Sequence, residues 1–420
     1  MSFPHATPSA LLPAAAADWR AAAYVLVAVA ASVLLGLYLV SAVRRGRRSR
    51  VGQRMTKGGG VFSLLTLAIA IVALHTKINF LVLVFGMLLS AFVLSFVLSR
   101  LTMRRLEFAR ALPTDVHAGE PLRVELRVTN RKRRLASYGL VVQDELPEGV
   151  SAEPPGGVVL ELRSRQAASV PYTATAARRG VYAFRTVGYS TRFPFGLFQQ
   201  GRARALPGEL VVYPRLGEVS AQLLGRTRAL ALAQQRTRGA RGEEEFRNLR
   251  EYRPGDNPRR IHWKTSAKLG KPLVREMEAV VSERVLILLD TRCPASGEAA
   301  LEAAISFAAT LARDLMLRGL FVGLAAYAPE LAVTAPAKSA TGLRALFGTL
   351  ARLEPNPERS LVELAAEPAV RGGGRLVTVV ALRRRDADAE AALELLQRHQ
   401  ARVLAVDASA PEFREVFHLV

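Results

Sequence analysis

Long apolar runs follow one another in the first quarter of the chain. Ala21–Val43 is 23 residues without a charge, Phe80–Ser99 is an apolar run of 20 residues, and Val61–Leu74 lies between them. A helix rises 1.5 Å per residue, so about 20 apolar residues cross a bilayer core. We therefore expect a transmembrane helix at 21–43 and, because the polar break at 75–79 is short, a transmembrane helical hairpin at 58–99.

Most basic residues that flank these runs lie in two segments, 44–57 and 100–110. Residues 44–57 hold seven Lys and Arg and no acid, and residues 100–110 hold four Arg and one Glu. Positive charge stays in the cytoplasm, which predicts a short extracytoplasmic N-terminus at 1–20, a basic cytoplasmic loop at 44–57 and cytoplasmic domains after Ser99. A cleaved signal peptide is the alternative for 21–43. The length of that run and the basic flank after it favour a retained helix.

A period of two begins after the apolar runs. Leu122, Val124, Leu126 and Val128 alternate with polar residues, as in a half-buried strand. Similar runs follow between turn-forming residues at 138–144, 157–163, 168–175, 181–188 and 209–213. This spacing predicts an immunoglobulin-like β-sandwich over 103–215. The stretch FPFGLF at 193–198 is expected to be a buried aromatic corner rather than a binding platform.

Strands and helices alternate from 281 to 420. Strands are expected at 285–290, 320–327, 330–335, 375–382 and 402–407, with helices at 297–318, 340–352 and 387–399. This alternation predicts a Rossmann-type α/β domain, a parallel sheet with helices on both faces. Ligands of such folds meet the carboxyl ends of the strands, so Asp290 stands at a site position. The chain has no Gly-rich dinucleotide fingerprint and no Walker A loop, which argues against nucleotide binding.

Charge is concentrated outside these regular elements. The chain carries a net charge of +22, and residues 226–275 hold 14 basic and 5 acidic side chains. This excess belongs to residues 216–280, which we expect to be a basic linker that includes a distinctive motif. Cys293 is the single cysteine of the sequence, so neither a disulfide nor a cysteine-based zinc site can form within the chain.

Residues 249–268 read LREYRPGDNPRRIHWKTSAK. This run resembles the signature of the bacterial family called domain of unknown function 58, in which it precedes a von Willebrand factor A-like domain. The order of the parts is similar too: a helical hairpin, a sandwich with a Pro-Phe-Gly-Leu-Phe corner at 194–198, the signature, and an A-like domain at 281–420. The matching signature residues are Arg250, Glu251, Tyr252, Gly255, Asp256, Arg260, His262, Trp263, Ser266 and Lys268.

The resemblance implies a membrane-anchored bacterial protein without an established enzymatic activity. Together with the apolar runs and the charge bias, this predicts a multi-pass protein of the bacterial inner membrane with cytoplasmic soluble domains. The resemblance also implies a scaffold or adaptor whose partner is a MoxR-type AAA+ ATPase or a transglutaminase-like membrane protein. Family members often carry an Asp-x-Ser-x-Ser motif, whose hard oxygen ligands suit Mg²⁺. Asp290, Arg292 and Pro294 stand at those positions here. A cation and a proline replace two ligands, so we expect a degenerate site that holds no metal, and no cofactor.

The basic motif admits several interpretations. Glu251, Asp256 and His262 form a conceivable acid–base set, but no nucleophile with a base stands out, so we expect no enzyme. Arginines with Tyr252 and Trp263 interleaved suit phosphates and bases, yet the excess charge is local and three glutamates precede it, which disfavours nucleic acid.

Three further interpretations remain, two for the motif and one for the A-like domain. Anionic-lipid binding by the motif and metal-dependent ligand binding by the A-like domain stay as alternatives. The preferred interpretation is a structural joint. In it Arg250, Arg260 and Glu251 tie the sandwich to the A-like domain, Trp263 packs beneath them, and one face meets a protein partner.

Overall fold

A computed structural model describes residues 52–76, 78–238, 244–279, 284–293, 297–328, 330–356, 358–371, 376–399 and 402–419. The helix expected at 21–43 and Pro294 lie outside the described residues. The chain divides into two compact units. The β-sheet unit comprises the described residues of Met1–Thr114 together with Pro121–Thr175 and Tyr182–Leu210, and the α/β unit comprises Asp115–Glu120, Ala176–Val181 and the described residues of Val211–Val420.

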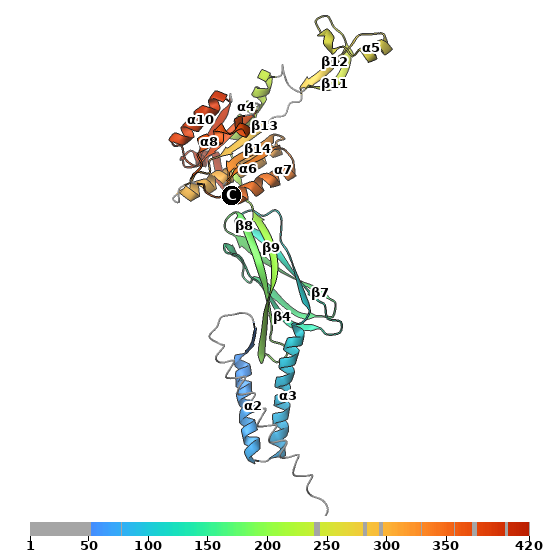
Figure 1. Cartoon of the computed structure of the whole chain (residues 1–420), viewed down its shortest axis with the longest axis vertical. Coiled ribbons are helices and arrows are strands. Elements are labelled where there is room, and N and C mark those ends of the chain that lie inside the picture. Colours follow the sequence, from blue (N-terminus) through green and yellow to red (C-terminus); the bar gives the residue numbers. More distant parts are fainter. Residues whose placement is uncertain are drawn as a thin grey trace, which may run out of the picture. The chain divides into compact units, whose positions relative to one another are not determined.

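Two apolar helices, α2 (Lys57–Thr76) and α3 (Asn79–Thr102), lie side by side as a hairpin in the β-sheet unit (Figure 1). Both are long and apolar enough to cross a membrane. Residues that are mostly small face inward from α2, namely Gly59, Gly60, Ser63, Thr66, Ala70 and Ala73. Small side chains let two helix backbones approach closely. The hairpin expected at 58–99 is therefore present, with slightly wider bounds.

Two antiparallel sheets make up the rest of the β-sheet unit. One has the order β1 (Gly52–Met55), β9 (Phe198–Val212), β8 (Gly180–Thr191), β4 (Ser137–Asp144), β6 (Gly156–Leu162). The other has the order β2 (Leu106–Ala111), β3 (Pro121–Asn130), β7 (Ala167–Ala176), β5 (Val150–Ser151). The sheets meet through buried side chains: the Tyr172 hydroxyl on β7 donates to Asp144 Oδ2 on β4 over 2.7 Å.

The sequence left three strands of this unit unrecognised, namely β1, β2 and the two-residue β5. Residues 52–55 pair with β9, with Met55 opposite Phe198, although 44–57 was expected to be a loop. Residues 106–111 form β2 and pair with β3. The aromatic corner is only half as expected: Leu197 and Phe198 are buried against Phe92 of α3, whereas Phe195 is exposed. Phe195 lies in the turn between β8 and β9, next to Gly196, whose φ is 69°.

One mixed sheet of five strands forms the centre of the α/β unit. Its order is β15 (Leu331–Ala337), β14 (Phe321–Tyr327), β13 (Arg284–Leu289), β16 (Val377–Leu382), β17 (Val403–Asp407). Four strands are parallel, and β15 runs antiparallel to β14 at the edge. The expectation of an all-parallel sheet was therefore wrong for this strand, because 328–330 is too short for the crossover that a parallel neighbour needs.

Helices cover both faces of this sheet (Figure 1). Val285, Ile287 and Leu289 of β13 pack with α6 (Glu298–Leu317), α7 (Ala340–Arg352) and α4 (Ala221–Arg238). Leu286 and Leu288 face the other side, against α8 (Leu361–Ala366) and α10 (Ala387–His399). Alternate residues of a strand point to opposite faces, so a strand that is apolar throughout needs this double cover. The remaining short elements are α9 (Pro368–Arg371), β10 (Gly217–Val219), α11 (Phe413–Val416) and β18 (Phe417–Leu419).

The segment 216–280 is not a linker in the described residues. It contains β10, α4 and a hairpin formed by β11 (Glu244–Glu251) and β12 (Leu273–Ala279). The tip of the hairpin carries a short 3-10 helix, η1 (Pro258–Arg260), and the helix α5 (Trp263–Leu269). Frequent charged residues interrupt the apolar periodicity of these elements, so the sequence pattern resembled that of a linker.

Gly59 gives a first testable consequence of the fold. A Cβ at Gly59 would lie 2.1 Å from the carbonyl oxygen of Leu197, whereas a Cβ at Gly58 would meet only Thr56 Oγ1 at 3.9 Å. We expect Gly59→Ala to destabilise the start of α2 by about 2–3 kcal/mol, because backbone must move to accept the methyl group. Hydrogen exchange at the Thr56 and Gly60 amides of the detergent-solubilised chain measures this. Gly58→Ala is the matched control, and equal exchange in the two variants would contradict the expectation.

Candidate functional site

All ten signature residues lie in one hairpin of the α/β unit. Arg250 pairs with Val274 and Glu251 with Leu273 across β11 and β12. The interior of the hairpin tip is small: Ser266, Leu273 and Val274 are its buried residues among those whose side chains are described, 248–275. Such a tip needs polar contacts to hold its shape, and the signature provides them.

Arg250 and Asp256 hold the first turn of the tip. The guanidinium donates to both carboxylate oxygens over 2.6 Å, and the Arg253 amide donates to Asp256 Oδ2 over 2.9 Å. The hydrogen bonds from Arg250, then from the Arg253 amide, lower the pKa of Asp256 to about 2. Gly255 has a φ of 106°, which disfavours any other residue in this turn. Asp256 therefore holds this turn through a backbone amide and the Arg250 side chain.

His262 and Ser266 fix the short helix α5. His262 Nδ1 accepts from the Thr265 amide over 3.3 Å and lies 2.8 Å from Thr265 Oγ1, so the ring caps the helix N-terminus. Ser266 Oγ accepts from the Leu273 amide over 2.8 Å and ties α5 to β12. The helix ends at Gly270, whose φ is 66°. These contacts use His262 and Ser266 for local structure.

One detail of the expected joint is wrong. Trp263 is not packed beneath other residues: it is 69% exposed, at the first position of α5. Glu251 pairs with Lys271 Nζ at 3.0 Å, and its strand neighbour Arg250 pairs with Asp256. Tyr252 is half-buried, and its amide donates to the Pro272 carbonyl over 2.9 Å.

The exposed side of the tip combines apolar and basic residues. Trp263 and Leu269 stand at the two ends of α5, and both are exposed. The tip also exposes the cations Arg259, Arg260, Lys264, Lys268 and Lys271. Residues 248–275 hold eight Lys and Arg against Glu251 and Asp256, a net charge of +6. This side is suited to bind an acidic surface that offers a pocket for an aromatic ring.

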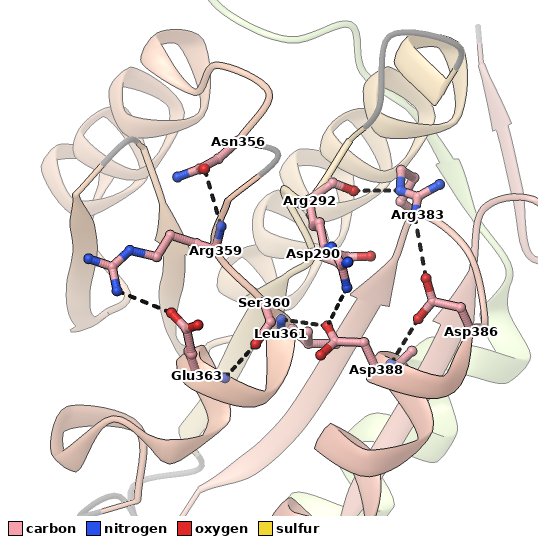
Figure 2. Close-up of polar contacts among 11 residues, drawn as sticks. Asp290, Arg292, Asn356, Arg359, Ser360, Leu361, Glu363, Arg383, Asp386 and Asp388 are labelled. Carbon is pink, nitrogen blue, oxygen red and sulfur yellow. Dashed lines mark hydrogen bonds and ion pairs between the residues drawn. The ribbon is translucent and has the colours of Figure 1, made fainter.

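The second candidate region lies where β13 and β16 end, at the point where the strand order reverses (Figure 2). Asp290 follows β13 and is buried, and Arg383 follows β16 and is nearly buried. The Arg292 amide donates to Asp290 Oδ1 over 3.1 Å, and Arg383 Nε donates to the Arg292 carbonyl over 2.6 Å. Arg383 also pairs with Asp386 at 3.6 Å. An arginine thus stands beside the carboxylate at the usual ligand position of such folds.

Residues of neighbouring loops contact Thr291 and Arg292 in this region. Arg292 Nη1 lies 3.7 Å from Asp388 Oδ2, which also accepts from the Leu361 amide over 2.8 Å. The Asn356 amide donates to the Thr291 carbonyl over 3.0 Å. Among the described residues no group of three or more His, Cys, Asp or Glu is placed to hold a metal ion. Pro294 is not described, so the loss of the metal site stays a prediction.

Burial raises the pKa of Asp290 to about 6, against a lowering by the Arg292 amide and the Arg383 charge. Between pH 3.8 and pH 6 the Asp290 carboxyl is therefore protonated in the folded unit but ionised in the unfolded chain. The free energy of unfolding falls as the pH rises through that window. We expect Asp290→Asn to remove roughly 3 kcal/mol of this decline, at about 1.4 kcal/mol per pKa unit. Hydrogen exchange of β13 and β16 at several pH values measures it, with the exposed Glu330→Gln as control. An unchanged pH dependence in Asp290→Asn would contradict the assignment.

The described elements thus define a protein with an apolar helical hairpin, a two-sheet β unit and an α/β unit that carries a basic signature hairpin. Residues 248–416 match the family model described as Protein of unknown function DUF58, and the match begins inside the hairpin. This match supports the DUF58 family for residues 248–416, which are less than half of the chain.

One curated relative is the uncharacterized protein YeaD of Bacillus subtilis (strain 168). It is 25% identical over 221 residues, which are 52% of this chain and 54% of YeaD. The match therefore spans about half the length of each protein.

Two solved structures share low similarity with the chain. The CARDB domain of PF1109 from Pyrococcus furiosus is 11% identical, with 24% of this chain and 94% of that domain covered and a TM-score of 0.15. The GH20 exo-β-N-acetylglucosaminidase from Vibrio harveyi is 10% identical, with 49% and 45% covered and a TM-score of 0.17. At these TM-scores neither likeness bears on the function or fold of the chain.

Proposed function

We propose that this chain is a membrane-anchored adaptor that binds a protein partner through the exposed side of the signature hairpin. In this proposal α2 and α3 cross the bacterial inner membrane, the soluble units face the cytoplasm, and the partner is a MoxR-type AAA+ ATPase. The observation that carries the proposal is the exposed Trp263. Tryptophan and arginine are the residue types most enriched among the dominant residues of interfaces.

The local contacts of the signature support an interface rather than catalysis. Arg250, Asp256, His262 and Ser266 are engaged in shaping the tip, whereas Trp263 lies on its surface. A rigid tip loses less conformational entropy on binding, which favours affinity. We also propose that the β-sheet unit is an immunoglobulin-like β-sandwich and that the α/β unit is a von Willebrand factor A-like domain. The two facing antiparallel sheets and the Rossmann-type strand order with a switch point support them.

The test compares surface variants of the full-length chain in nanodiscs, with binding of the purified MoxR-type ATPase of the same bacterium measured by biolayer interferometry. We expect Trp263→Ala to weaken binding by at least about 2 kcal/mol, or roughly 30-fold in Kd. The fold should be unchanged, because the Trp263 side chain is exposed. Leu160→Ala is the matched control, since Leu160 is also a large exposed apolar residue, on β6 of the other unit.

Three outcomes of this comparison have distinct meanings. Equal binding by the two variants would overturn the proposed interface. Loss of hydrogen-exchange protection at Leu273 and Val274 in Trp263→Ala would indicate that Trp263 stabilises the hairpin rather than binds a partner. Salt-sensitive retention on DNA or on anionic liposomes, abolished by the same substitution, would favour nucleic acid or lipid instead.

A further inference from the structure

Loops of the β-sheet unit meet the apolar hairpin at one end of α2 and α3. Lys132 Nζ donates to the carbonyl oxygens of Leu101 and Thr102, at 3.0 and 2.9 Å, in the last turn of α3. It also lies 2.5 Å from Ser137 Oγ, which itself donates to the Thr102 carbonyl over 2.9 Å. Two points of the loop 131–137 are therefore fixed to the end of the helix. Between them, Arg133, Arg134 and Leu135 are exposed.

A second loop is fixed to the start of α2 in the same way. The Thr56 hydroxyl donates to the Gly196 carbonyl over 2.6 Å, and the Thr56 amide donates to the Leu197 carbonyl over 3.0 Å. Thr56 Oγ1 also accepts from the Gly59 amide over 2.9 Å, in the first turn of the helix. The turn at 192–196 is thereby held against the helix start, and Phe195 is exposed.

An aromatic contact joins the two loops. The rings of Tyr138 and Phe193 are stacked, with their centroids 4.9 Å apart. We call the segments 52–57, 100–107, 131–138 and 192–197 the collar, because they surround the two helix ends. They contain ten Lys and Arg and one acid, Glu107, which pairs with Arg131 at 2.7 Å. Within this basic surface Leu135 is 51% exposed and Phe195 is 57% exposed.

We propose that the collar lies in the headgroup layer of the membrane that α2 and α3 cross and binds anionic phospholipids there. The proposal rests on the membrane anchoring in the proposed function, but it concerns residues outside the spans and outside the signature hairpin. Lys and Arg near an anionic leaflet are attracted to it, while exposed aliphatic and aromatic side chains enter the boundary between headgroups and acyl chains.

Charge and continuity favour lipid over other occupants. A second copy of the chain would bring a collar of the same sign, which is repelled. Most Lys and Arg of the collar are exposed, whereas the core of a protein interface is depleted in charged residues. The apolar helices begin and end within the collar itself, so a spanned membrane places its headgroups at these residues.

The experiment uses the full-length chain with an NBD label at single cysteines, in a Cys293→Ala background, in nanodiscs of phosphatidylcholine with or without phosphatidylglycerol. Leu135→Cys reports on the collar. Val93→Cys, an exposed position on α3 about 14 Å along the helix from Thr102, reports on the bilayer centre. Arg123→Cys, exposed on β3 toward the strand end that is remote from Asn130, reports on water.

In phosphatidylglycerol nanodiscs, lipids brominated near the headgroups should quench the label at position 135 strongly and the label at position 123 hardly at all. Removal of one arginine should lower the equilibrium constant for binding of the collar to the anionic surface about fivefold. Arg133→Glu with Arg134→Glu should therefore abolish the response of position 135 to phosphatidylglycerol. Arg123→Glu with Arg127→Glu, reversals of two exposed arginines on β3, should leave it unchanged.

The labels separate the two ways in which the experiment can fail. If position 93 is quenched by deeply brominated lipids but position 135 is not, the chain is anchored and the collar proposal is wrong. If position 93 is not quenched either, the anchoring itself fails. Quenching at 135 that is equal with and without phosphatidylglycerol would overturn the binding of anionic lipid.

Discussion

Asp144→Ala should lower the free energy of unfolding of the β-sheet unit by about 3–5 kcal/mol, because it leaves a buried guanidinium without its counter-ion. Arg110 and Asp144 form an ion pair at 2.5 Å, and their side chains are 2% and 0% exposed. Arg110 also donates to the carbonyls of Leu206 and Thr186, and its guanidinium carbon lies 4.7 Å from the centre of the Phe184 ring. The Tyr172 hydroxyl donates to the same carboxylate, and burial together with this bond raises the pKa of Tyr172.

Hydrogen exchange of β3 and β4 in the detergent-solubilised full-length chain measures this loss. Glu107→Ala is the matched control, since Glu107 pairs with Arg131 on the surface, where such pairs contribute about 0–1 kcal/mol. Arg110→Ala combined with Asp144→Ala should cost much less than the sum of the two single substitutions, because the charges are removed together. A loss below about 1 kcal/mol in Asp144→Ala would contradict the buried network.

Arg110 shows where the sequence misleads. It follows an apolar span among other arginines, so its charge counts with the basic flank of the membrane hairpin. In the fold it lies on β2 and points into the interior between the sheets. The interior position of Arg110 depends on the pairing of β2 with β3 and on the ion pair with Asp144 of β4. A charge bias computed along the sequence does not separate a buried arginine from a flanking one.

The α/β unit could be predicted in more detail than the β-sheet unit. Helices α7 and α10 begin and end where the apolar period placed them, at 340–352 and 387–399. Ser339 caps α7 by accepting from the Gly342 amide, a signal that is local in sequence. The long strand β9 was expected only at 209–213, since its first half is polar and its partners, β1 and β8, come from distant segments.

The candidate site divides in the same way. The Asp256 turn follows from Gly-Asp-Asn-Pro, a local pattern. The pairing of Glu251 with Lys271 depends on the register of β11 and β12, which the charged sequence does not reveal. Asp290 could be placed at the end of an apolar strand, but its proximity to Arg383 requires that β16 lie next to β13. Strand order is a property of the whole sheet, and no short pattern encodes it.

Arg179→Ala should destabilise the α/β unit by about 3–4 kcal/mol, because it removes a buried guanidinium that donates to a carboxylate and to two carbonyl groups. Arg179 donates to Glu302 of α6, to the Leu350 carbonyl over 2.9 Å and to the Leu353 carbonyl over 2.8 Å. Its side chain is 5% exposed, and burial lowers the pKa of the guanidinium to about 10, so the group remains charged at neutral pH. These bonds tie the end of α7 to α6.

Arg178→Ala is the control next in sequence. Arg178 pairs with Glu298 of α6 at 2.7 Å, but the Arg178 side chain is 71% exposed. The loss of this pair should therefore cost less than about 1 kcal/mol. Hydrogen exchange of α6 and α7 in the full-length chain distinguishes the two variants. Arg179→Lys should recover only part of the stability, because an ammonium group lacks the planar fork that reaches several acceptors at once. Equal exchange in Arg178→Ala and Arg179→Ala would mean that burial of the guanidinium does not determine the stability of this unit.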